Sequence, residues 1–150
     1  MRLTISLIAL LLLSSCSEDD NLVPTPEVIY TPISGRVSGE FTAIQSPYRV
    51  TQDIIIDSNS TLTINAGVVI HFEENTRLIV KGELLVEGSN TDYVVFKSYD
   101  NLKTWSGIKI IDADKPAYFN FIKIQKINQA VDTSFVSASI SIMNSEVEFN

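Results

Sequence analysis

Apolar and polar residues alternate at every second position in this chain, within short bursts, and this pattern constrains the fold more than any other feature. Clear examples are residues 61–64 and 83–86. A period of two is that of a β-strand with one buried face, because successive side chains point to opposite sides. Ser, Asn, Asp and Gly separate the bursts, as expected for turns. The pattern therefore predicts an all-β fold.

The bursts also repeat in groups of three. Residues 53–57, 61–64 and 68–72 form one triplet, and residues 77–80, 83–86 and 93–96 form the next. Corresponding bursts begin 24 and 22 residues apart, and a fixed period of this size is typical of a solenoid. Three short strands per repeat predict a right-handed parallel β-helix of about four coils.

Alternation further predicts which side chains are buried and which are solvated. We expect Leu62 to stack on Leu84, and Ile64 on Val86, in ladders about 4.8 Å apart. Residues 33–42 are expected to form a pair of cap strands over the first coil. The interior positions are predicted to be Leu62, Leu78, Leu84, Val94 and Ile108, and the solvated ones Thr63, Lys81, Glu83, Lys97 and the outward His71.

Four short motifs carry a resemblance to a known family. They are SPYRV at residues 46–50, TLTINAGV at 61–68, RLIVKG at 77–82 and WSGI at 105–108. In this order and at these separations, residues 33–111 resemble a family of bacterial right-handed parallel β-helix proteins. One departure is Ala66, where the family usually has Pro. The resemblance implies the pectin-lyase-like shape without fixing an activity.

The first sixteen residues have the order of a secretory signal peptide. Arg2 precedes an uncharged run over residues 3–13, which is shorter than the roughly 20 residues that span a bilayer. The sequence Leu-Ser-Ser-Cys at residues 13–16 resembles the lipobox of bacterial lipoproteins. That resemblance implies a signal peptide of residues 1–15 and a lipid on Cys16. Through this lipid the protein would bind its partner, the membrane. The alternative is that Cys16 is an ordinary small residue near the cleavage point.

Residues 16–32 are predicted to form an acidic, proline-rich tether, and residues 33–150 the β-helix domain with its N-terminal cap. The acidic cluster at residues 18–20 resembles the export signal of surface lipoproteins from the Bacteroidetes group. The resemblance implies a lipid-anchored location on the outer face of the outer membrane. A solvated spacer is the other interpretation of the cluster, and it leaves open which face of that membrane the protein occupies.

The charge of the chain excludes one class of partner. The formal net charge is −7, and no Lys and Arg residues cluster in the sequence as nucleic-acid binding requires. Such a chain should also repel anionic lipids and polymers, unless a local basic patch or a cation intervenes.

Three aromatic residues near one predicted loop, residues 99–104, are the candidate ligand contacts. Tyr93, Tyr99 and Trp105 could stack on sugar rings, and insertions in solenoids often lie on a functional face. The alternative for Trp105 is packing against its own coil.

No catalytic residue, cofactor or metal is predicted. His71 is the sole histidine and Cys16 the sole cysteine, so no zinc ligand set can be read from the sequence. Asp112 and Asp114 resemble a carboxylate pair for Ca²⁺ or a glycosidase, but their surroundings are those of a turn, and we favour the turn.

Together these features predict a lipid-anchored cell-surface module that is not an enzyme. Its role would be binding, adhesion or scaffolding, toward a glycan (carbohydrate binding) or an envelope protein. The alternative is the N-terminal fragment of a polysaccharide lyase or glycosidase. The sequence stops at Asn150 on an alternating strand, so either the chain is truncated or a partner covers the last coil. The oligomeric state is left open.

Overall fold

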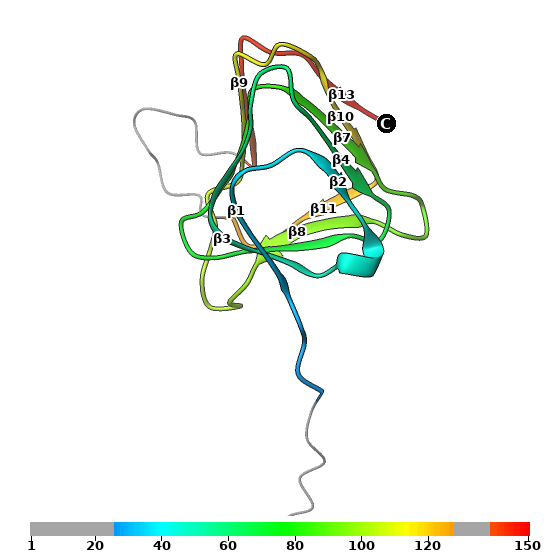
Figure 1. The fold of residues 1–150 in the computed structure, drawn as a ribbon, viewed down its shortest axis with the longest axis vertical. Helices are drawn as coiled ribbons and strands as arrows, with labels where there is room; N and C mark the ends of the chain where they lie inside the picture. The colour runs from blue at the N-terminus through cyan, green and yellow to red at the C-terminus, as the bar shows by residue number, and fades with distance from the viewer. Residues whose placement is uncertain (1–25, 128–138) are drawn as a thin grey trace, which may run out of the picture.

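The computed structural model describes residues 26–127 and 139–150, and this part of the chain is all-β (Figure 1). Every strand pair is parallel, and the strands form two curled sheets. The larger sheet has the order β11-β8-β5-β3-β6-β9-β12 with β1 also on β3, and the smaller one β13-β10-β7-β4-β2. The elements are β1 (Thr31–Arg36), β2 (Gly39–Phe41), the 3-10 turn η1 (Ala43–Gln45), β3 (Tyr48–Ile56), β4 (Thr61–Asn65), β5 (Val69–Phe72), β6 (Leu78–Val80), β7 (Glu83–Glu87), β8 (Val94–Ser98), β9 (Ile108–Ile111), β10 (Ala117–Asn120), β11 (Ile122–Ile124), β12 (Ile140–Met143) and β13 (Val147–Phe149).

The long strand β3 bends the larger sheet into two walls. Its first half pairs with β5, as Tyr48 with Ile70, and its second half pairs with β6, as Ile54 with Leu78. We call the first half of β3 with β5, β8 and β11 wall 1, and the second half with β6, β9 and β12 wall 2. The smaller sheet is wall 3, whose strands are stacked along one side of the molecule in Figure 1.

The chain visits the three walls in a constant order, which agrees with the predicted period. From β3 to β13 the described strands make four successive layers, and β1 and β2 precede them as an incomplete one. Leu62 pairs with Leu84 and Ile64 with Val86, so the predicted stacking on wall 3 is confirmed.

The two strands predicted as a cap are present, but each belongs to a different sheet. β1 pairs with β3 and β2 pairs with β4, both in parallel. They therefore extend the walls by an edge strand each and do not pair with one another.

The interior between the walls is a continuous apolar core, and the five predicted interior positions are confirmed. Leu62, Leu78, Leu84, Val94 and Ile108 are all fully buried. Of the positions predicted to be solvated, Lys81 is exposed, whereas Thr63, Glu83, Lys97 are only half-exposed. Neighbouring layers lie close enough for outward side chains to shield one another.

The corner between walls 1 and 2 differs from layer to layer. The chain passes it without a break in β3, by a short turn after β5, and by a longer loop over residues 99–107 after β8. The predicted insertion near residues 99–104 is therefore a loop. Among the described residues, no helix is long and apolar enough to cross a membrane.

Candidate functional site

An aromatic and cationic surface lies on the outer side of wall 1. The strand register places Arg49 of β3 beside His71 of β5, and His71 beside Lys97 of β8. These side chains point outward because the alternate residues of the same strands fill the core. With Tyr30 and Tyr99, which pack over His71, they form what we call the tyrosine face.

The rings of the tyrosine face contact one another edge to face. The centroid of Tyr30 lies 5.0 Å from that of His71 and 5.3 Å from that of Tyr99. The guanidinium carbon of Arg49 lies 4.0 Å from the centroid of the Tyr99 ring, within the range of a cation–π contact. Arg49 also forms an ion pair of 2.7 Å with Glu73, which fixes the guanidinium in place.

The segment before β1 and the tyrosine face enclose an open groove. Its volume is about 630 Å³, which falls within the usual size range of small-molecule sites. The groove joins apolar and aromatic surface with an arginine, a threonine and a carboxylate. The lining residues are Glu27, Val28, Ile29, Tyr30, Pro32, Arg49, Thr51 and Tyr99.

His71 is buried beneath this surface, which corrects the prediction that it is solvated. Only 9% of its surface is exposed, because Tyr30 and Tyr99 cover the outward side of the ring. Burial, followed by the positive charge of Lys97, lowers the pKa of His71 to about 4. The imidazole is thus neutral at pH 7, and its Nδ1 has no hydrogen-bond partner.

The structure does not bring the three predicted contact residues together. Tyr99 belongs to the tyrosine face and is 38% exposed. Tyr93 lies at the other end of β8, half-buried, with the Lys123 ammonium 4.0 Å from its ring centroid.

Trp105 is a core residue, and the alternative interpretation of it is the correct one. It is fully buried, and its ring stacks on Phe72 with centroids 4.1 Å apart. Its indole nitrogen donates to the carbonyl oxygen of Gln125 at 2.8 Å. A side chain so enclosed is not available to a ligand, so its assignment as a ligand contact is corrected. Cys16, the predicted lipidation site, lies outside the described residues.

Asp112 and Asp114 act as turn residues. Asp112 has a positive φ of 48° and accepts a hydrogen bond from the Asn144 amide. Asp114 accepts one from the backbone N–H of Asn59. Lys115, the next residue, forms an ion pair of 3.3 Å with Glu83 of β7. Within the described ranges, His, Cys, Asp and Glu nowhere gather in groups of three that could hold a metal ion.

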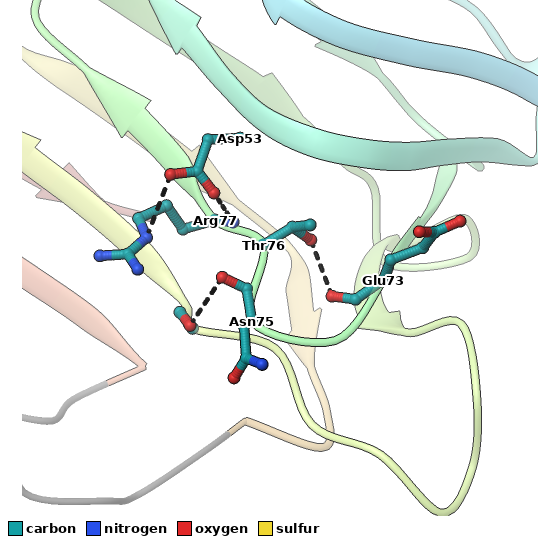
Figure 2. Close-up of polar contacts among 6 residues, drawn as sticks. Asp53, Glu73, Asn75, Thr76 and Arg77 are labelled. Carbon is teal, nitrogen blue, oxygen red and sulfur yellow. Dashed lines mark hydrogen bonds and ion pairs between the residues drawn. The ribbon is translucent and has the colours of Figure 1, made fainter.

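A second polar cluster closes the turn between β5 and β6. Figure 2 shows both carboxylate oxygens of Asp53 engaged by Arg77, one by its backbone N–H at 3.0 Å and one by Nε at 3.3 Å. The Thr76 hydroxyl donates to the carbonyl oxygen of Glu73 at 2.8 Å. Asn75 takes a positive φ of 63° at the tip of the turn. These contacts hold the turn itself, so the cluster is structural.

Sequence reasoning missed Tyr30 and Arg49 as parts of the tyrosine face. Tyr30 was placed in the tether, and Arg49 in a motif that indicates only the fold. The available signal was the layer spacing, because Arg49, His71 and Lys97 occupy one outward column in three consecutive layers.

Comparison with known proteins gives little information on function. No family model matches the chain, and no solved structure matches it. A curated relative, Protein bark beetle of Drosophila melanogaster, is 35% identical over 60 residues. That match covers 40% of this chain and 2% of the relative.

Proposed function

We propose that this chain is a lipid-anchored, non-catalytic binding module built on a right-handed parallel β-helix. The parallel pairing of successive strands on wall 3, such as β4 with β7 at a spacing of 22 residues, supports the helix, since connections between parallel strands are right-handed by strong preference. The lipobox resemblance at Cys16 supports a lipid anchor. The acidic cluster at residues 18–20 supports display on the outer membrane surface.

The tyrosine face carries the proposal of a binding role. It offers the exposed ring of Tyr99, an arginine held by Glu73 and an adjoining groove of about 630 Å³. Rings present flat apolar area to a ligand at low entropic cost, and a fixed guanidinium donates hydrogen bonds in a defined plane. Such groups bind and orient a glycan or protein segment without requiring any bond to be broken.

Binding can be tested with a matched pair of tyrosine variants. The mature chain is titrated with a panel of neutral and acidic polysaccharides and with envelope proteins. We expect Tyr99→Ala to lower the affinity for the tightest-binding ligand of the panel by about tenfold, because the contact with the tyrosine ring is lost. Tyr118→Ala, on the half-buried outer side of wall 3, should leave the affinity unchanged. Equal losses in both variants would contradict a site at the tyrosine face.

The lipid anchor has a separate test. Cys16→Ser should abolish processing and detergent partitioning, because it removes the sulfur that would carry the lipid. A variant that is processed and fractionates with membranes as the wild type does would refute the anchor.

The enzymatic alternative predicts cleavage of a polysaccharide, and we expect none. The carboxylates of Asp112 and Asp114 are engaged by Asn144 and Asn59 in a turn, which does not leave a free acid and base pair. The purified chain should release no reducing ends or unsaturated products from pectin or alginate, with or without Ca²⁺. If the chain releases such products and Asp112→Asn abolishes the release, the enzymatic alternative is correct.

A further inference from the structure

Charge is distributed unevenly among the walls. The strands of wall 1 contain Arg49, His71, Lys97 and Lys123, and residues 48–50, β5, β8 and β11 contain no Asp or Glu. The strands of wall 3 contain no Lys or Arg. Their acids are Glu40, Glu83, Glu87 and Glu148. In a chain with a formal net charge of −7, wall 1 is therefore a local basic surface.

The basic side chains of wall 1 are accessible. Lys123 is exposed, Lys97 is half-exposed and the Arg49 side chain is 36% exposed. Lys126, just after β11, is also exposed. Because paired strands lie about 4.8 Å apart, these charges are close enough to act on one surface together.

Carboxylates also lie near this surface, among them Asp100 beside Tyr99. Glu73 is paired with Arg49, and Glu27 lies on the groove in the N-terminal segment. His71, with its pKa lowered to about 4, is neutral at pH 7.

The N-terminal segment approaches the domain on the same wall. Tyr30 packs against His71 and Tyr99, and Figure 1 shows the segment before β1 extending away past this side of the molecule. The ten residues from Cys16 to Pro26 span at most about 35 Å. A lipid on Cys16 therefore keeps the domain within about that distance of the bilayer, and the described part of the segment joins the domain at wall 1. In this segment Val28 and Ile29 are 55% and 86% exposed, so two apolar side chains lie beside the basic groups.

We propose that the outer surface of wall 1, including the tyrosine face, rests against anionic lipid headgroups, so that wall 1 faces the membrane and acidic wall 3 faces away. This inference rests on the proposed anchor, and it assigns the proposed binding face to lipid headgroups in place of a glycan or a protein segment. Lysines and arginines near an anionic surface attract the headgroups, and exposed apolar residues beside them enter the interface. The acids of wall 3 are repelled by the same surface, which fixes the orientation.

The test uses the full mature chain carrying Cys16→Ser, so that only the protein surface can bind lipid. It is mixed with phosphatidylcholine vesicles, with or without about one third phosphatidylglycerol, and sedimented. We expect binding to the anionic vesicles alone and its loss at high salt. Lys97→Gln and Lys123→Gln should each reduce binding about fivefold. Lys81→Gln is the matched control, because Lys81 is exposed outside wall 1.

Several outcomes would overturn the inference. They are equal binding to neutral and anionic vesicles, no binding to either kind of vesicle, and a loss of binding in Lys81→Gln as large as in Lys97→Gln and Lys123→Gln. Binding to a soluble acidic polysaccharide without binding to anionic vesicles would assign the surface to a glycan. Buried Trp105 reports by its fluorescence that each variant is folded. Failure of lipidation in the wild type would not alter these measurements, so the two proposals fail separately.

Discussion

Truncating Leu84 tests the packing of the whole stack. Leu84 is fully buried and lies between Leu62 and Ala117 in one inward column of wall 3. Leu84→Ala removes three carbons, which costs about 2.4 kcal/mol in transfer free energy. The small Ala117 side chain cannot fill the space, so the cavity adds to this cost. We expect the free energy of unfolding to fall by about 3–5 kcal/mol.

The matched control is the next residue of the same strand. Leu85 points outward and is half-buried, so Leu85→Ala should cost about 1 kcal/mol or less. Both variants are unfolded in urea and followed by the fluorescence of Trp105, and the free energies are obtained by linear extrapolation. Comparable losses in the two variants would refute the register, because a slip by one residue exchanges the faces of the strand.

Three further measurements test separate features. Gly82→Ala should destabilise by more than about 2 kcal/mol, because its Cβ would overlap the carbonyl oxygens of Asp57 and Ser60; urea unfolding no different from wild type would contradict this. Since the pKa of His71 is about 4 folded and near 6.5 unfolded, stability should be full above pH 6.5 and fall by at most about 3 kcal/mol toward pH 4. His71→Gln should remove that dependence in pH-dependent unfolding. Tyr30→Ala should raise the pKa of His71 toward 6.5 in an NMR titration of this single imidazole, whereas an unchanged value would mean that Tyr30 does not shield it.

The core could be predicted from the sequence because strand alternation is a local property. Leu84 and Val94 follow from the pattern of their own strands, and the pairing of Leu62 with Leu84 follows from the repeat length. His71 could not be placed in the same way. Its burial depends on Tyr30, 41 positions away on a segment without periodicity, and alternation says nothing of what covers an outward face.

The tyrosine face was predicted only through Tyr99. Trp105 was grouped with it because both lie near one loop, but the chain turns inward between them, and Trp105 fills the core against Phe72. The outward column of Arg49, His71 and Lys97 on wall 1 could be predicted only with the strand register of three layers. The step from Arg49 to His71 is 22 residues and that from His71 to Lys97 is 26, so a single fixed period would misalign it.

The edge position of β1 determines how the domain responds to tension. A pull on the segment before β1 acts first on the contacts of Tyr30 with His71 and Tyr99, and then on the hydrogen bonds between β1 and β3, since β1 pairs only with β3. The register of that pair shifts between Ile33 and Gly35, so the strand is held in two short stretches that can detach in turn. β1 would then yield before any complete layer opens. Release of β1 would lengthen the N-terminal segment under load, while the later layers keep their shape.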